Sequence, residues 1–240
     1  MSNPEMLSTD ELLSHPEVVR VTDKINPEFV ERTAYRPPVC DVLTGHATEL
    51  IEDDIYRFEK DREARVLLPG IIDNKVQRIN AKAGSGGGAD KDYSRRRTIG
   101  IVFSGGPAPG GHNVIAGIYD AAKKANPESV ILGFLLGPDG IIENEVIEIT
   151  GEMVDAHRNL GGFTMIKTGR AKIDTSEKMA LSRETCKKLN LDALVVVGGD
   201  DSNTNAAFLA QEMAADGIQV IGVPKTIDGD IQVRDAGGKV

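Results

Sequence analysis

The sequence predicts an α/β fold in which helices cover both faces of a doubly wound, mostly parallel sheet. The first observation is a set of apolar runs without polar alternation, such as Val130–Leu136 and Ala193–Val197, which is typical of strands buried on both faces. The second is that helical segments such as His112–Asn126 separate these runs, as parallel strands require. The third is that glycines and charges follow the runs, where such sheets bind ligands.

The part of the chain from Thr98 onward supplies the elements of this sheet. The expected strands are Ile99–Phe103, Val130–Leu136, a short third or edge strand at Val146–Ile149, Ala193–Val197 and Ile218–Val223. The expected helices are His112–Asn126, one from Thr175 to about Leu189, and one over about Thr204–Ala215. Thr175 suits a helix start because its hydroxyl can accept a backbone N–H group of the first turn.

Residues 1–97 follow a different pattern, with many charges, several prolines and no dominant strand pattern. Short helices are expected near Asp10–Ser14, Pro27–Arg32 and Thr48–Lys60. Lys82–Tyr93 is rich in glycine and predicts a flexible connector. We therefore expect residues 1–97 to form a helical N-terminal extension, which packs on an α/β domain formed by residues 98–240.

Composition excludes several classes of function. The net charge is −9 and the isoelectric point about 5.0, which argues against nucleic-acid and membrane-surface partners, because both attract basic faces. No signal-like segment and no apolar run long enough to span a membrane is evident. Cys40 and Cys186 are the only cysteines and form neither a disulfide framework nor a zinc site. A reducing, cytoplasmic setting fits best.

A glycine-rich loop follows the first of these strands and opens the first helix. Its sequence from Ser104 to Asn113 is Ser-Gly-Gly-Pro-Ala-Pro-Gly-Gly-His-Asn. Glycines such as Gly105 and Gly106 let backbone N–H groups face an anion, and the helix N-terminus adds positive potential. The alternative is a tight turn without a ligand. His112 is expected to cap the helix or to pack locally.

Two adjacent carboxylates, Asp200 and Asp201, follow Ala193–Val197 and two glycines. Neighbouring acids repel one another unless a cation or a helix N-terminus offsets their charge. In the functional interpretation, one carboxylate and the phosphate oxygens of a ligand hold Mg²⁺, with water completing its shell. In the alternative, Asp201 or Ser202 simply starts a helix.

A charged loop, Pro224-Lys-Thr-Ile-Asp-Gly-Asp230, follows the last strand. Asp228 is suited to accept the proton of an attacking hydroxyl, and Lys225 to support charge on a transferring group. Asp230 would orient the loop, and the alternative for the whole segment is a plain surface loop. Arg170 follows another short apolar stretch, where its guanidinium suits phosphate oxygens, although a lone arginine is more often a surface residue.

Together these segments resemble the phosphofructokinase family, and most closely its pyrophosphate-dependent branch. The resemblance covers about Ile99–Asp230. It rests on the glycine-rich loop, Gly161-Gly-Phe163 with Gly169-Arg170, Gly198–Asn205 and Pro224–Asp230, in the family's order. It implies reversible phosphoryl transfer from pyrophosphate to the 1-hydroxyl of fructose 6-phosphate.

The resemblance also implies roles for single residues. Gly105 and Gly106 would contact the phosphoryl donor, Arg170 would bind its phosphates, and Asp200 would bind Mg²⁺. Asp201 and Ser202 belong to the same donor site. Lys225 would steady the transferred phosphoryl group, Thr226 would touch the sugar phosphate, and Asp228 would be the base.

Asp201 is the residue that argues against an ATP-dependent relative of the same fold. Such relatives have glycine there, which leaves room for the nucleotide. A carboxylate adds bulk and negative charge near the α-phosphate, and like charges in a site of low dielectric repel. Pyrophosphate has no third phosphate to clash. Lys225 also resembles the pyrophosphate branch, where an added cation supports the inorganic leaving group.

The chain departs from the family in two respects. Pro107 stands where glutamine is common, and the family continues into a second α/β domain that binds most of the sugar phosphate, whereas this sequence stops at Val240. We therefore expect a fragment, a truncated product, or a subunit that acts as a homo-oligomer or with a complementing chain. A catalytically silent regulatory subunit is the alternative from another class, and the presence of Lys225 and Asp228 opposes it.

Overall fold

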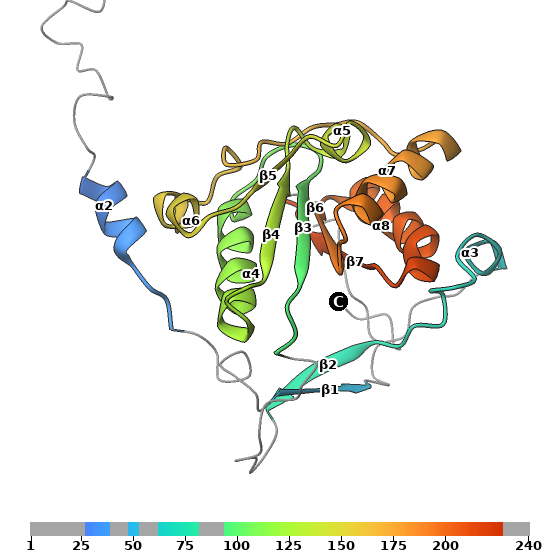
Figure 1. Cartoon of the computed structure of the whole chain (residues 1–240), viewed down its shortest axis with the longest axis horizontal. Coiled ribbons are helices and arrows are strands. Elements are labelled where there is room, and N and C mark those ends of the chain that lie inside the picture. The colour runs from blue at the N-terminus through green and yellow to red at the C-terminus, as the bar shows by residue number, and fades with distance from the viewer. Residues whose placement is uncertain (1–26, 39–47, 53–61, 82–93, 228–240) are drawn as a thin grey trace, which may run out of the picture.

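The main body of the protein is a sheet between two layers of helices (Figure 1). This computed structural model describes residues 27–38, 48–52, 62–81 and 94–227. Five strands form the sheet in the order β5-β4-β3-β6-β7. They are β3 (Thr98–Phe103), β4 (Val130–Phe134), β5 (Val146–Glu148), β6 (Ala193–Gly198) and β7 (Gln219–Pro224). The edge strand β5 is antiparallel to β4, and all other pairs are parallel. The predicted mostly parallel α/β sheet is confirmed.

Successive residues of the central strands face opposite helical layers. Helices α4 (Gly111–Ala125) and α6 (Gly151–His157) lie on one face, and α5 (Pro138–Ile142), α7 (Ser176–Lys188) and α8 (Asp200–Met213) lie on the other (Figure 1). Val195 and Val197 of β6 pack in the apolar cluster with Ile115 of α4. Val196 packs in the second cluster with Leu209 of α8. Both faces are therefore covered, which explains the unalternating apolar runs.

Most predicted elements of the main body are confirmed within a few residues. The Thr175 hydroxyl caps α7 by accepting the Lys178 N–H group at 3.2 Å. Helix α8 begins at Asp200, earlier than the predicted start at Thr204, because the two carboxylates occupy its first turn, where acidic side chains are favourable. The sequence reasoning missed α5 and α6. Cys186 is buried.

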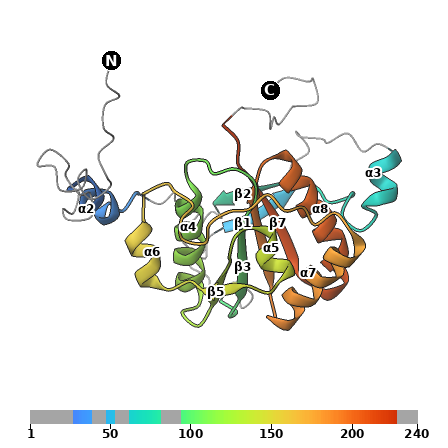
Figure 2. The ribbon, with the colours of Figure 1, turned by 90° about the horizontal axis from the view of Figure 1, so that it is seen from above.

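The described parts of the N-terminal segment lie outside this body, as Figure 1 shows, and its two short helices lie at opposite ends of the molecule (Figure 2). They are α2 (Pro27–Ala34), β1 (Thr48–Glu52), α3 (Arg62–Leu67) and β2 (Gln77–Ala81). The helix expected at Pro27–Arg32 is confirmed. The helix expected at Thr48–Lys60 is wrong over β1, where Leu50 instead pairs with Ile79 of an antiparallel neighbour. Asp10–Ser14, the rest of Thr48–Lys60 and the connector lie outside the described residues.

Side-chain contacts hold part of this segment to the main body. The Asn159 amide donates to the backbone oxygens of Arg32 at 2.8 Å and Tyr35 at 2.7 Å, and Arg36 pairs with Asp155 at 3.1 Å. The contacts tie α2 and the residues after it to the α6 side of the body.

Among the described residues, no helix combines the length and apolar character needed to cross a membrane.

Candidate active site

The glycine-rich loop after β3 is held at the carboxyl end of the sheet by backbone and hydroxyl contacts. The Ser104 N–H group donates to the Val197 oxygen at 2.8 Å, and the Gly105 N–H group donates to the Gly169 oxygen at 2.8 Å. The Thr168 hydroxyl donates to the Gly105 oxygen at 2.7 Å. Gly105 has a φ of 87°, a conformation that glycine adopts without strain. The loop therefore has a defined path between two neighbouring segments.

Arg170 reaches this loop because the segment before it passes very close to the backbone after β4. A Cβ at Gly169 would lie 2.0 Å from the Leu136 oxygen, and one at Gly137 would lie 2.4 Å from the Gly169 nitrogen. Only glycine allows this approach. Beyond it, Arg170 Nη2 lies 3.5 Å from where a Cβ on Gly106 would stand. Arg170 is exposed and has no hydrogen bond or ion pair with another described residue.

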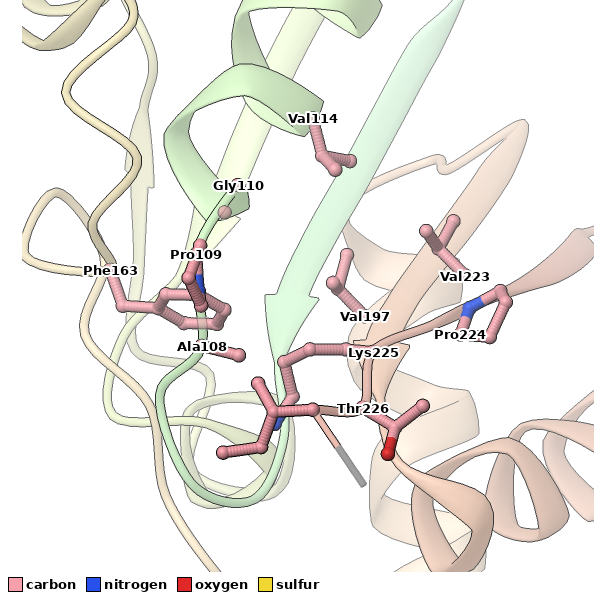
Figure 3. Close-up of a pocket in the computed structure, with 12 residues that line it drawn as sticks. Ala108, Pro109, Gly110, Val114, Phe163, Val197, Val223, Pro224, Lys225 and Thr226 are labelled. Atoms are coloured by element: carbon pink, nitrogen blue, oxygen red, sulfur yellow. The ribbon is translucent and has the colours of Figure 1, made fainter. Parts of the chain in front are cut away.

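Lys225, directly after β7, approaches the same loop. Its backbone N–H group donates to the Gly198 oxygen at 2.8 Å, and its ammonium donates to the Gly106 oxygen. The Phe163 ring lies beneath the ammonium, 5.8 Å from ring centre to Nζ. Figure 3 shows Lys225 and Phe163 on either side of the loop that carries Ala108 and Pro109.

The environment of Lys225 disfavours its charged form. Burial, followed by the nearby positive charge of Arg170, lowers the pKa of Lys225 below its usual value. No carboxylate of the described residues forms an ion pair with Lys225 that would offset this repulsion. Two cations held near each other without a carboxylate between them would gain most from an anion that binds to both. The arrangement is therefore suited to phosphate oxygens.

The acidic pair opens α8 directly beside this loop. The helix cap is Gly199, with Asp200 and Asp201 in the first turn. The Ser202 hydroxyl donates to the Ser104 hydroxyl at 2.8 Å, which joins α8 to the start of the glycine-rich loop. The cap is thus neither Asp201 nor Ser202, although both residues lie at the start of the helix, as the alternative expected. Both carboxylates are exposed.

The two carboxylates differ in their partners. Asp201 pairs with Lys172, with Nζ and Oδ2 2.7 Å apart. Asp200 is exposed and has no ion pair with another described residue. The described residues contain no group of three or more His, Cys, Asp or Glu side chains placed to hold a metal ion. Mg²⁺ commonly uses one or two carboxylates with phosphate oxygens and water, so a site at Asp200 would need the ligand to complete it.

Two cavities flank the glycine-rich loop. The first, of about 310 Å³, has an apolar wall that includes Phe163 and Val223, and Lys225 and Thr226 at its mouth (Figure 3). The second, also about 310 Å³, is polar. It is lined by Ser104, Gly105, Arg170, Ala171, Lys172, Asp201, Ser202 and Asn205. Gly105 and Lys225 stand between the two, since a Cβ on Gly105 would lie 3.8 Å from Lys225 Nζ.

Most of the predicted site residues are thus brought to one end of the sheet. Gly105, Arg170, Asp201 and Ser202 share the polar cavity, Lys225 and Thr226 border the apolar one, and Gly106 accepts from Lys225. Asp228 and Asp230 lie outside the described residues, so their roles stay predictions.

Phe163 beneath Lys225 and Lys172 beside Asp201 have contacts that the sequence does not predict. The expected local packing of His112 is confirmed, since this residue is 2% exposed and its Nε2 accepts the Met165 N–H group at 3.2 Å. Its buried Nδ1 has no hydrogen-bond partner among the described residues. Burial, together with His157, lowers the pKa of His112 to about 4.

Comparison with known proteins identifies the class to which this fold and site belong. The profile of the family described as phosphofructokinase matches residues 98–237, which include every motif discussed above. The chain therefore belongs to the phosphofructokinase family.

Curated relatives point to one branch of this family. The chain is 43% identical over 204 residues to a pyrophosphate–fructose 6-phosphate 1-phosphotransferase of Porphyromonas gingivalis, covering 84% of this chain and 36% of the relative. A protein of the same name in Treponema pallidum is 55% identical over 136 residues, covering 56% and 24%. A relative in Solanum tuberosum named as the alpha subunit of such an enzyme is 41% identical, covering 56% and 22%. The chain thus spans about a third or less of these relatives' lengths.

A solved structure agrees with the fold. The crystal structure of a pyrophosphate-dependent phosphofructokinase from Nitrosospira multiformis superimposes with a TM-score of 0.52 at 23% identity, covering 57% of this chain and 36% of that one. At this identity the likeness shows the α/β fold alone.

Proposed function

We propose that this chain carries the donor half of a pyrophosphate–fructose 6-phosphate 1-phosphotransferase. The observation that carries the proposal is the convergence of Lys225 and Arg170 on one glycine-rich loop, with no ion-paired carboxylate among the described residues to neutralise either cation. The relatives at 43% and 55% identity are named for pyrophosphate and fructose 6-phosphate, and the proposal takes these as the donor and the acceptor. An ATP-dependent reaction is the less favoured candidate because Asp201 lines the polar cavity.

In this proposal the donor phosphates occupy the polar cavity. The Gly106 N–H group and the guanidinium of Arg170 bind the phosphate oxygens, since each offers a donor or positive charge. Gly105 lines the cavity, but its N–H group already donates to the Gly169 oxygen. Ser202 lies at the cavity wall beside Ser104. Lys225 stabilises negative charge on the transferred phosphoryl group. Asp228 accepts the proton of the sugar's 1-hydroxyl, and Thr226 contacts the sugar phosphate.

Mg²⁺ is the proposed cofactor. Asp200 suits it because its carboxylate is exposed, is not ion-paired with any described residue, and opens onto the same end of the sheet. A bound Mg²⁺ would neutralise phosphate charge there. The remaining ligands would be phosphate oxygens and water, as is usual for this ion.

This chain matches only part of the length of its relatives, and the proposed reaction also needs an acceptor site from outside the matched part. We propose that it acts as a homo-oligomer or with a complementing chain, in line with the relatives that are named as alpha and beta subunits. A reducing, cytoplasmic setting is part of the same proposal.

A segment exchange tests the function. Residues 98–237 would replace the matching segment of the Treponema pallidum relative, which is 55% identical to this chain over 136 residues. We expect the chimera to form fructose 1,6-bisphosphate from pyrophosphate in a coupled assay and to use ATP poorly. The same chimera with Lys225→Met is the matched control and should lose most of the activity. A folded chimera that transfers phosphate only from ATP would refute the proposed donor.

A further inference from the structure

The ion pair between Lys172 and Asp201 forms part of the wall of the polar cavity. Lys172 follows Arg170 by two residues, and Asp201 is the second residue of α8. Their Nζ and Oδ2 atoms are 2.7 Å apart, and both side chains line the cavity that Arg170 and Gly105 also line. The pair therefore connects two segments that are distant in the sequence, on the surface that a ligand in this cavity would meet.

The neighbouring contacts hold Lys172 and Asp201 where they can meet. The Asn205 amide of α8 donates to the Ile173 oxygen at 3.0 Å and accepts the Ile173 N–H group at 3.2 Å. The Lys178 ammonium donates to the Lys172 oxygen at 3.0 Å. These contacts hold the backbone beside Lys172 against α7 and α8. The exposed Lys172 side chain can therefore reach Asp201 from a fixed backbone position.

Charge balance gives the pair its significance. An unpaired Asp201 carboxylate in a cavity that binds phosphates would repel the ligand, whichever donor it was. Lys172 reduces that repulsion, because its ammonium lies 2.7 Å from the carboxylate and carries the opposite charge. What Asp201 still contributes to the cavity is volume.

We propose that Lys172 is a specificity-determining positioning residue, which neutralises and holds Asp201 so that this carboxylate excludes a third phosphate by its bulk without repelling pyrophosphate. The proposal rests on the proposed function, because it takes the polar cavity to be the donor site. It goes beyond that function by giving Lys172 a role that acts through Asp201, and by separating the steric effect of Asp201 from its charge.

A double-mutant cycle on the full 240-residue chain tests this role. Binding of Mg²⁺-pyrophosphate would be followed by ³¹P NMR line broadening, which detects weak binding. Lys172→Met keeps the aliphatic stem, Lys172→Arg keeps the charge, and Asp201→Asn removes the carboxylate charge at nearly constant size. We expect Lys172→Met to weaken pyrophosphate binding roughly tenfold, as one unshielded carboxylate near the anion would do, and Lys172→Arg to bind like the original protein.

Comparing Lys172→Met in the original protein and in Asp201→Asn distinguishes a role of Lys172 through Asp201 from a direct contact with phosphate. In Asp201→Asn, adding Lys172→Met should change the Kd by less than about twofold, the usual limit of additivity for uncoupled changes. An equal loss in both backgrounds would make Lys172 a direct phosphate ligand and overturn the proposal, as would no loss in either. Thermal melting of each variant shows whether its fold is retained.

Binding of Mg²⁺-ATP tests the steric part of the proposal. Asp201→Asn should exclude ATP as well as the original chain does, within about twofold, whereas Asp201→Gly should admit it. If Asp201→Asn admitted ATP as readily as Asp201→Gly, charge would be the determinant and the steric part would be overturned. If the unsubstituted chain failed to broaden the pyrophosphate signal at millimolar ligand, the proposed function would itself fail, before any variant was compared.

Discussion

Among the described residues, two cations at the carboxyl end of the sheet lack the ion-pair partner that a cation at the amino end has. At the amino end, the Asp192 carboxylate accepts the Thr98 N–H group at 2.8 Å and pairs with Arg95 at 3.1 Å. At the carboxyl end, Arg170 has no partner among the described residues, and Lys225 donates only to a backbone oxygen among them.

Under the proposed function, the amino end serves stability and the carboxyl end serves ligand binding. Paired groups at the amino end complete the hydrogen bonding of buried strand ends, which lowers the free energy of the folded state. Unneutralised cations at the carboxyl end cost stability and gain a partner only when an anion binds. Substitutions at the two ends should therefore separate binding from stability.

The largest effect is expected from Asp228→Asn, measured in the chimera that contains the complete acceptor site. Loss of a positioned base should lower turnover roughly 10²–10⁴-fold, while pyrophosphate affinity changes much less. Asp192→Asn in the same chimera is the amino-end control and should leave turnover unchanged. Near-normal turnover in Asp228→Asn would mean that another group takes the proton.

His112 should make the carboxyl end sensitive to acid. Its pKa is lowered to about 4 in the folded protein, against about 6.5 in the unfolded chain, so the unfolded state binds the extra proton between these values. The free energy of unfolding should therefore keep its full value above pH 6.5. It should fall by about 2 to 3 kcal/mol as the pH falls toward 4. Urea unfolding at pH 7.5 and 4.5 measures the loss.

Two variants sharpen the test of His112. His112→Gln offers an oxygen in place of Nε2 to the Met165 N–H group, whereas His112→Met of similar size does not. Both should remove this residue's share of the acid sensitivity, and Gln should retain more stability at pH 7.5. Acid sensitivity equal to that of the original protein in both variants would assign it to other groups.

Lys225→Met should weaken binding of Mg²⁺-pyrophosphate by about 10- to 100-fold, the range for losing a hydrogen bond to a charged group. The free energy of unfolding should not fall, because the substitution also removes a desolvated cation near Arg170. Calorimetric titration and urea unfolding of the same preparation measure both quantities. A parallel loss of binding and stability would show that Lys225 is mainly structural and would remove the contrast between the two ends.

The pH dependence of binding follows from the same residue. Because the pKa of Lys225 is lowered, pyrophosphate affinity should begin to fall at a pH below the usual lysine value as the ammonium loses its proton. Lys225→Arg should abolish this alkaline decrease, since arginine stays protonated. An unchanged alkaline decrease in Lys225→Arg would assign it to another group.

The smallest effect on binding is expected at the amino end. Asp192→Ala leaves the Thr98 N–H group, whose residue is 5% exposed, without its acceptor and should cost about 1 to 3 kcal/mol of stability. Pyrophosphate affinity should stay the same. Asp192→Asn keeps an acceptor oxygen and should lose less stability. A marked change in affinity in Asp192→Ala would show that the two ends are coupled.

The sequence predicted the sheet, and the end of the sheet at which glycines and charges gather, because both depend on local pattern. Apolar runs such as Ala193–Val197 predict strands covered on both faces, and glycines and charges after them predict the carboxyl end as the binding edge. The same reasoning failed at Thr48–Glu52. These residues form a strand because Leu50 pairs with Ile79, a distant segment, and such pairing outweighs local propensity.

Motif order and spacing thus determined by themselves the fold class and the residue types that gather at the carboxyl end of the sheet. Only the tertiary structure decided the pairing of Lys172 with Asp201, the approach of Lys225 to Gly106 beside Arg170, and the burial of His112. Each depends on how separate loops pack at the end of the sheet. Charge–charge interactions depend on distances through space, and spacing along the chain does not give those distances.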